Sequence, residues 1–472
     1  MTACDSQPGA PNTCPGGYHC TPDGHCDAQC TQAGKECGDG YHCTADGSCE
    51  QDGACDGIAC DVVKCEAMGM PATTISGKVF APNGTLPLYG VQVYVPLHPV
   101  ADLPDGAVCS QCQDTPSGDP IVSDVTKEDG TFTLTDVPSG PNIPLVIVSG
   151  KWRRIVTVST VAQCTDNPIG AADTTFPKSM TDMTPNTVSV NMPRLAITTG
   201  NADNLECLIR KMGVADSEIT LPTGPGKINI YHGNGKTKTT AAFGGGSYTF
   251  PEAQPFWSSE DSMKKYDAVI FSCEGAQNPG TKPQAAMDAV KGYADFGGRV
   301  FASHWHNIWI EGSTTGGGNQ KPAVWPSVAS WTNDQTNNLP DPTTDLIDEV
   351  NNPKGMSFAT WMLNVQGSMT RDQVTINQPR ATCNQVDLTK GERWTYLQDN
   401  GGNTQNFQFT TPNEVDAGSR CGKVVFSDMH VSASPGSGDY PQSCGTSLAL
   451  SPQEKALAFM LFDLSSCVGQ IF

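Results

Sequence analysis

The sequence predicts a multidomain protein in three parts: disulfide-rich N-terminal modules, an antiparallel β-sandwich, and an α/β domain with a mainly parallel sheet. The prediction rests on three observations. The chain has 20 cysteines, of which 11 precede Lys78. Short segments with strand-like alternation and turn residues come next. Continuous apolar strands then alternate with helical segments, which is typical of a sheet covered on both faces. We place the parts at residues 1–70, 71–194 and 195–472.

The charge and hydrophobicity of the chain limit the kinds of molecule that it is expected to bind. The 472-residue chain carries 28 basic and 49 acidic residues, which gives a net charge of −21. This acidity argues against nucleic acid or an anionic membrane as the main partner and fits the surface of a secreted protein. No apolar run reaches the length of a membrane span, so we expect no transmembrane segment. The P-loop, dinucleotide and Gly-x-Ser-x-Gly fingerprints do not occur in the sequence. The sequence therefore gives no motif for a nucleotide cofactor.

The first part contains a tandem repeat of cysteines. Residues 14–26 read CPGGYHCTPDGHC, and residues 37–49 read CGDGYHCTADGSC. Each copy has an Asp-Gly turn and few apolar residues, so we expect disulfides to stabilise it in an oxidising compartment. The alternative is a metal site that combines His19, His25 and His42 with thiolates. The repeat resembles the EGF-like or dickkopf-like modules of exported bacterial proteins, which implies a spacer or stalk.

The N-terminus offers a short localisation signal. Thr2-Ala3-Cys4 matches the end of a bacterial lipobox, which would make Cys4 a lipid anchor. Setting aside Cys4 and a buried Cys273 leaves an even 18 cysteines for disulfides. The alternative is that Cys4 forms a disulfide. Either interpretation predicts an extracellular or outer-cell-surface protein, secreted or lipidated.

The second part alternates strand signals with turns. The strand-like segments are 74–80, 90–95 and 126–140, and the last contains Asp-Gly-Thr-Phe-Thr-Leu before Val-Pro-Ser-Gly. This arrangement resembles the carboxypeptidase regulatory-like, prealbumin-type β-sandwich, which implies a non-catalytic module. Cys109 and Cys112 fall in an insertion of this sandwich. We expect them to form a local disulfide or to pair with Cys164 and Cys207, rather than to act as a redox pair.

The third part has the rhythm of an α/β domain. We expect strands at 195–199, 227–231, 266–272, 298–303 and 422–427, and helices at 204–211, 284–296 and 451–464. Residues 309–421 break this rhythm because they are rich in Asn, Gly, Thr and Pro, with one helical patch around 346–363. We interpret them as a long insertion near the carboxyl edge of the sheet.

Polar residues follow each expected parallel strand. The strand ends are Thr198-Thr-Gly200, Tyr231-His-Gly-Asn-Gly235, Cys273-Glu-Gly275, His304-Trp-His306 and Asp428-Met-His430. Because open α/β sheets bind ligands at the carboxyl ends of their strands, these residues predict a cleft there.

The same residues carry a second resemblance. Residues 296–304 (FGGRVFASH) and 421–430 (CGKVVFSDMH) resemble the class I glutamine amidotransferase-like superfamily, a flavodoxin-like α/β fold, and in particular its ThuA-like branch. In amidotransferases a catalytic cysteine follows the first of these strands, and here His304 stands in its place. The resemblance implies that His430 is the family's late histidine. An imidazole is a poor replacement for a thiolate in forming a glutamyl thioester, so we expect no glutaminase activity.

The candidate site residues follow from these positions. We expect His304, His430 and Glu274 to be the catalytic candidates, with Glu274 orienting a histidine or acting as a base. His304, His306 and His430, with Glu274 or Asp428, form the candidate set for a divalent metal. We expect Cys273 to be a buried thiol or half of a disulfide, not a nucleophile.

Two functions remain open at this point. The first is an extracellular or surface-anchored binding or structural protein with a modified, non-amidotransferase α/β head. Its extracellular ligand is unknown, and a carbohydrate is one candidate. The second is a secreted hydrolase or carbohydrate-active enzyme that uses the histidine-rich cleft. The sequence does not decide whether the protein is an enzyme.

Overall fold

The structure is a computed structural model of the chain. It describes four short strands before residue 52 and then residues 55–469, except 113, 242, 244–246, 314–322, 335–338 and 432–436. The chain forms two compact units, Met1–Asp61 and Val62–Phe472. Within the described residues, no helix is both long enough and apolar enough to cross a membrane.

In the first unit, each copy of the cysteine repeat forms an antiparallel hairpin. β1 (Tyr18–Cys20) pairs with β2 (Cys26–Ala28), and β3 (Tyr41–Cys43) pairs with β4 (Cys49–Gln51). The register places the first and last cysteine of each hairpin opposite each other, so the two copies fold alike. A disulfide joins Cys55 to Cys60 beside η1 (Gly57–Asp61). The lipid anchor predicted at Cys4 and the metal alternative at His19, His25 and His42 lie outside the described residues and side chains.

The second unit begins with the expected sandwich. One sheet has the order β12 (Thr187–Asn191), β10 (Trp152–Val161), β9 (Gly140–Ser149), β6 (Gln92–Pro96) and β7 (Pro120–Val125). The other has the order β11 (Asp166–Pro168), β5 (Thr74–Lys78) and β8 (Thr131–Thr135), followed along the chain by α1 (Ala171–Thr174). In β8, Phe132 and Leu134 are buried while Thr133 and Thr135 are exposed, as the period of two predicts. The sandwich is not purely antiparallel, because β11 runs parallel to β5.

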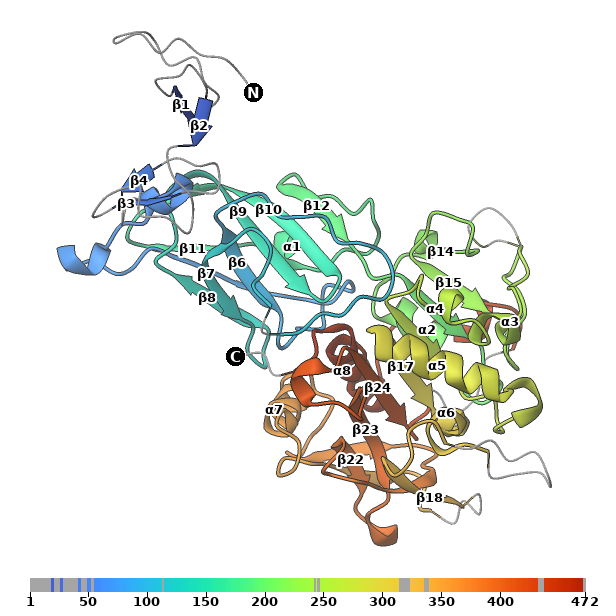
Figure 1. The fold of residues 1–472 in the computed structure, drawn as a ribbon. Helices are drawn as coiled ribbons and strands as arrows, with labels where there is room; N and C mark the ends of the chain where they lie inside the picture. The colour runs from blue at the N-terminus through green and yellow to red at the C-terminus, as the bar shows by residue number, and fades with distance from the viewer. Residues whose placement is uncertain are drawn as a thin grey trace. The chain divides into compact units, whose positions relative to one another are not determined.

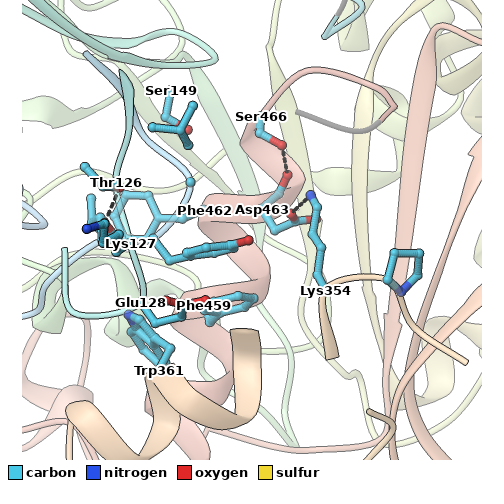
Figure 2. A pocket seen from close by; sticks show the side chains of 15 residues that line it. Thr126, Lys127, Glu128, Ser149, Lys354, Trp361, Phe459, Phe462, Asp463 and Ser466 are labelled. Atoms are coloured by element: carbon cyan, nitrogen blue, oxygen red, sulfur yellow. Dashed lines mark hydrogen bonds and ion pairs between the residues drawn. The ribbon is translucent and has the colours of Figure 1, made fainter. Parts of the chain in front are cut away.

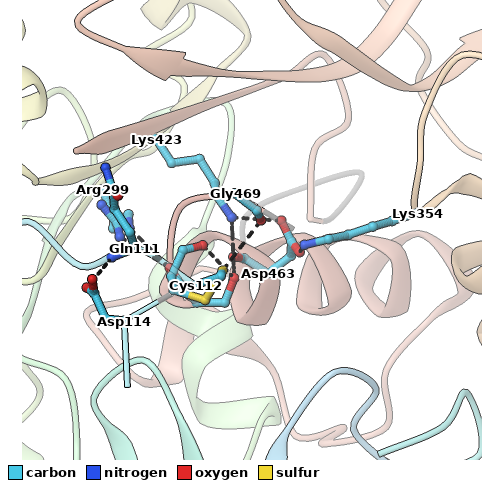
Figure 3. The surroundings of a disulfide bond; sticks show 10 residues. Gln111, Cys112, Asp114, Arg299, Lys354, Lys423, Asp463 and Gly469 are labelled. Carbon is cyan, nitrogen blue, oxygen red and sulfur yellow. Dashed lines mark hydrogen bonds and ion pairs between the residues drawn. A yellow bond between two sulfur atoms is a disulfide. The ribbon is translucent and has the colours of Figure 1, made fainter. Parts of the chain in front are cut away.

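The disulfides of the second unit differ from those we expected. Cys109 pairs with Cys421 and Cys112 with Cys467, so the prediction of a local bridge, or of pairs with Cys164 and Cys207, was wrong. Those two cysteines pair elsewhere, in Cys65–Cys164 and Cys207–Cys444. The reason is that the insertion holding Cys109 and Cys112 runs along the α/β part, where the backbone N–H of Cys112 donates to the Val468 carbonyl. Figure 3 shows Cys112 beside Gly469, whose carbonyl oxygen lies 3.5 Å from the Cys112 sulfur.

Two described cysteines are thiols. Cys273 is free and buried, which confirms one expected alternative, and Cys383 is free and buried as well. The second thiol removes the parity argument for Cys4. With Cys273 and Cys383 set aside, the even 18 includes Cys4.

The α/β part is built on a ten-stranded mixed sheet. Its parallel half has the order β14 (Ile219–Thr220), β15 (Ile228–Tyr231), β13 (Leu195–Thr198), β16 (Ala268–Phe271), β17 (Arg299–Ser303) and β24 (Gly422–Ser427). Its antiparallel half continues with β23 (Thr404–Thr411), β22 (Glu392–Leu397), β19 (Thr343–Ile347) and β20 (Gln373–Ile376). A separate ribbon joins β18 (Ala329–Asp334) to β21 (Ala381–Val386). In Figure 1, the label of β24 lies beside that of β17, although more than a hundred residues separate the two strands.

Helices cover both faces of the parallel strands. The α-helices are α2 (Leu205–Lys211), α3 (Ala253–Trp257), α4 (Glu260–Met263), α5 (Gln284–Phe296), α6 (Ile308–Glu311), α7 (Gly355–Asn364) and α8 (Pro452–Ser465). Short 3-10 turns are η2 (Cys65–Met68), η3 (Asp216–Glu218), η4 (Pro279–Thr281), η5 (His304–Asn307), η6 (Asn400–Gly402), η7 (Ala417–Ser419) and η8 (Gln442–Cys444). Lys423 of β24 contacts Asp463 of α8, whereas its neighbour Val424 belongs to the apolar cluster that contains α5. Because consecutive strand residues point to opposite faces, α8 and α5 lie on opposite faces of the sheet.

The region expected as an insertion is part of the sheet. Residues 309–421 contribute the four antiparallel strands that extend β24. The expected helical patch is confirmed in α7, but the prediction that it begins near Leu346 was wrong, because Leu346 lies in strand β19. In that strand Thr343, Asp345 and Ile347 are buried and alternate with less buried residues, so tertiary pairing selects the strand.

Candidate functional site

The polar strand ends meet at one edge of the sheet. β15, β13, β16, β17 and β24 are consecutive parallel neighbours, so the residues after them share the carboxyl edge. Parallel pairing therefore brings together Cys273, His304 and His430, which lie far apart in the sequence. Candidate ligand atoms of these three side chains all lie within 4.8 Å of one another. The sequence predicted this meeting for the two histidines.

His304 occupies a strained position between β17 and η5. Its φ is +42°, in the left-handed region that non-glycine residues rarely adopt. A residue held there costs roughly 1–3 kcal/mol, and such residues concentrate at functional sites. The side chain is nevertheless only 5% exposed. The structure therefore forms a sharp strand-to-helix elbow, but the residue at its tip is buried.

The three side chains contact one another through a single ring nitrogen. His304 Nδ1 lies 3.2 Å from His430 Nε2 and 3.4 Å from the Cys273 sulfur. Each residue follows a different strand, namely β16, β17 and β24. The cluster therefore depends on the register of the sheet and not on any local sequence motif.

The protonation states of the cluster disfavour nucleophilic chemistry. Burial raises the pKa of the Cys273 thiol to about 12. Burial also lowers the pKa of His430 to about 3, and together with the charge of Arg380 it lowers the pKa of His304. At neutral pH the folded chain therefore holds a thiol and two neutral imidazoles. Among the described residues, no carboxylate accepts a hydrogen bond from the His430 ring, as a catalytic triad would require.

Asp203 holds the two histidine-bearing loops in place. Its carboxylate accepts hydrogen bonds from the Ser303 hydroxyl at 2.7 Å and from the Val431 N–H at 2.8 Å. These donors are the direct neighbours of His304 and His430. The amide of Gln453 in α8 also donates to the His430 carbonyl at 2.6 Å. The sequence alone did not single out Asp203, although this acid lies just beyond the end of β13, in the same row of strand ends as the other candidates.

His306 stands apart from the cluster. Its ring stacks on Phe271 with ring centroids 5.2 Å apart and on Trp309 at 5.8 Å. The turn of η5 separates the directions of His304 and His306, so the structure does not place His306 in the three-residue group. Trp257, Trp309 and Trp325 are likewise buried in the apolar cluster and offer no exposed platform for sugar stacking.

Glu274 belongs to a neighbouring polar cavity. Its carboxylate lies 2.5 Å from the Lys282 ammonium and 3.1 Å from the Asn278 amide nitrogen, and neither of these partners is a histidine. A cavity of about 380 Å³ opens beside it. The lining residues are His232, Gly233, Asn234, Glu252, Gln254, Trp257, Glu274, Asn278, Gly280 and Thr281. The cavity lies beyond the carboxyl ends of β15 and β16, where an α/β sheet is expected to bind a ligand.

Gly233 shapes the wall of this polar cavity. A Cβ at this position would lie 2.5 Å from the Thr199 carbonyl oxygen and 2.9 Å from Glu274 Oε1. Only glycine lets the backbone pass so close to both groups. The amide of Asn234 donates to the Glu274 carbonyl at 3.1 Å and fixes the two loops to each other.

A second cavity, of about 460 Å³, lies between the sandwich and the α/β part. Figure 2 shows Trp361, Phe459 and Phe462 on its apolar side and the ion pair between Lys354 and Asp463 beside them. Burial would raise the pKa of Asp463, but the ammonium groups of Lys354 and Lys423 outweigh burial and lower it. Lys423 is near the amino end of β24, so this cavity lies at the edge of the sheet opposite to the histidines.

Comparisons with known proteins add little to this geometry. No family model matches the chain, and no curated protein matches it. Two solved structures share 16% and 15% identity with it, cover 32% and 33% of this chain and 78% and 79% of their own, and have TM-scores of 0.14. Both are interface mutants of a type II cohesin–X-dockerin complex from Acetivibrio cellulolyticus. Likeness at this level establishes neither a shared fold nor a shared function.

Proposed function

We propose that this chain is an exported, disulfide-stabilised surface protein that binds a ligand through a non-amidotransferase α/β head. The cysteine modules act as a stalk and the sandwich, carboxypeptidase regulatory-like in pattern, as a spacer. Five disulfides among the described residues support an extracellular or outer-cell-surface location, because disulfides persist in oxidising compartments. Lipidation at Cys4 is part of this proposal.

Strand order supports the amidotransferase-like and ThuA-like assignment of the head. Numbered along the chain without the two-residue β14, the parallel strands β15, β13, β16, β17 and β24 have the order 2-1-3-4-5. This is the order of flavodoxin-like folds. In such folds the elbow after the strand at the β17 position is where the superfamily carries its nucleophile.

The observation that carries the proposal is the state of that elbow. His304 stands there buried, and its Nδ1 contacts His430 and Cys273 instead of solvent. An acyl transfer needs an exposed, activated nucleophile, and a thiol whose pKa is raised to about 12 supplies almost no thiolate at neutral pH. The elbow therefore retains the shape of the amidotransferase site without its chemistry.

The polar cavity supports a polyhydroxylated ligand, and we propose a carbohydrate. Its lining offers amide groups from Asn234, Gln254 and Asn278 and a carboxylate from Glu252. Amides and carboxylates are suited to the donors and acceptors of neighbouring hydroxyl groups. Ion pairing with Lys282 fixes the Glu274 carboxylate, so this acid serves as a positioned acceptor.

One observation favours the alternative of a secreted hydrolase. The positive φ of His304 stores strain, and strained residues concentrate at active sites. In that alternative His304 and His430, which lie 3.2 Å apart, would be the catalytic groups, with Glu274 as the further candidate.

The experiment is a binding titration of the full chain against a panel of mono- and oligosaccharides, with analysis of the recovered sugar. We expect the heat of binding to saturate as sugar is added, and the sugar recovered afterwards to be chemically unchanged. Gln254→Ala should weaken binding, whereas Gln284→Ala, a matched change near the start of α5 outside the cavity lining, should not. Recovery of hydrolysed sugar, with loss of hydrolysis in His304→Ala, would establish the enzyme instead.

A further inference from the structure

We propose that Cys273, His304 and His430 form a buried binding site for one zinc-class divalent metal ion. The proposal does not depend on the carbohydrate-binding function, because the polar cavity and the cluster share no lining residue. It replaces His306, which the sequence suggested, with Cys273.

The distances fit a tetrahedral ion. With Zn–N near 2.05 Å and Zn–S near 2.3 Å, tetrahedral angles place two nitrogen ligands about 3.3 Å apart and a sulfur and a nitrogen about 3.6 Å apart. His304 Nδ1 lies 3.2 Å from His430 Nε2 and 3.4 Å from the Cys273 sulfur. Both of these edges agree to within a few tenths of an ångström, and the ligand atoms of the third pair, Cys273 and His430, lie within 4.8 Å of each other.

Hydrogen bonding alone satisfies the cluster poorly. A neutral imidazole nitrogen carries either one proton or one lone pair. His304 Nδ1 nevertheless faces two partners within 3.4 Å, so only one of these contacts can be a well-formed hydrogen bond at a time. A metal ion would use the lone pairs of both nitrogens and of a thiolate together.

The donor set has the composition of a known class of site. One thiolate and two imidazoles are ligands that zinc prefers. Cys273 and Cys383 are both buried thiols, but only Cys273 faces two histidines.

The surroundings hold the ligands. Asp203 binds the residues next to His304 and His430 and so fixes both loops, as outer-shell groups do in metal sites. Such a framework is preorganised by three neighbouring strands.

The test uses the full, disulfide-bonded chain. Its metal content is measured as purified, and the chain is then stripped with a chelator and titrated with Co²⁺, whose near-ultraviolet charge-transfer absorption reports thiolate ligation. We expect about one ion per chain and a band that saturates at about one equivalent. The band identifies a cysteine ligand in the unmodified protein, so this readout stands even where a variant fails to fold.

Matched variants assign the ligands. Cys273→Ala should abolish the Co²⁺ thiolate band, whereas Cys383→Ala, which removes the other buried thiol, should retain it. His430→Ala should weaken metal uptake, and His306→Gln should leave the band in place. Absence of the band in the unmodified chain, or its persistence in Cys273→Ala, would overturn the proposal. Sugar binding is measured separately, so its loss or retention leaves this result unchanged.

Discussion

Replacing Lys282 with methionine is expected to destabilise the α/β head strongly. The Lys282 side chain is fully buried, lies 2.5 Å from the Glu274 carboxylate and stands 4.9 Å above the Trp257 ring. Burial lowers the pKa of Lys282, and the charge of Glu274 opposes that shift. Removing one partner of a buried ion pair costs about 3–5 kcal/mol, because the other charge stays desolvated and unpaired.

The double variant separates the ion pair from simple packing. Lys282→Met with Glu274→Gln removes both charges, and replacing a buried pair by neutral groups is often close to neutral. We therefore expect the double variant to recover most of the loss, with a coupling energy of about 2–3 kcal/mol. The assay is denaturant unfolding of the disulfide-intact chain, followed by tryptophan fluorescence, because Trp257 and Trp309 pack around the ammonium group.

Two results would refute this reasoning. Lys282→Met could unfold within about 0.5 kcal/mol of the unmodified chain, which is the range of surface substitutions, and the pair would then be solvated. Alternatively, the double variant could be as unstable as the sum of the single variants, and the loss would then come from packing instead of an uncompensated charge.

Three further predictions concern stability and binding. Burial raises the pKa of Glu206 from 4.5 to about 8, so its contribution to stability is fully present below pH 4.5 and is lost as the pH rises through 8. Glu206→Gln should therefore flatten the pH dependence of Tm and raise Tm above pH 8; an unchanged profile would contradict this. Cys109→Ser with Cys421→Ser opens a bridge between residues 312 positions apart and should cost about 2–4 kcal/mol in denaturant unfolding, whereas no loss would show that the bridge is not formed in solution. Gly233→Ala should abolish sugar binding in calorimetry, because its Cβ would lie 2.5 Å from a carbonyl oxygen, and full binding would exclude the polar cavity.

Local pattern was sufficient to predict the parallel strands and their helices. The predicted helix at 284–296 is α5, and the predicted strand at 422–427 is β24. Continuous apolar runs and glycine stops mark these elements whatever packs on them. The meeting of His304 with His430 followed from the same elements, because His304 comes directly after β17 and His430 three residues after the neighbouring parallel strand β24.

The remaining features depend on contacts that local pattern does not encode. The antiparallel half of the sheet is polar, with Asp345, Asn406 and Gln408 buried in its strands. Because these segments lack the continuous apolar runs of the parallel strands, the sequence predicted an insertion there. Disulfide partners more than 300 residues apart depend on how the sandwich insertion meets the α/β part. The sequence also could not predict the directions of the Glu274 and His306 side chains. A one-residue step along a strand end or a 3-10 turn changes the face on which a residue lies.

The elbow at His304 carries no activated nucleophile, and the folded chain should therefore be inert toward an electrophile that targets one. The most direct measurement is the intact mass of the full, folded chain after incubation with an electrophilic glutamine analogue, followed by peptide mapping. We expect an unmodified folded chain, with Cys273 labelled only after unfolding. A stoichiometric adduct on Cys273 or His304 in the folded chain would contradict it.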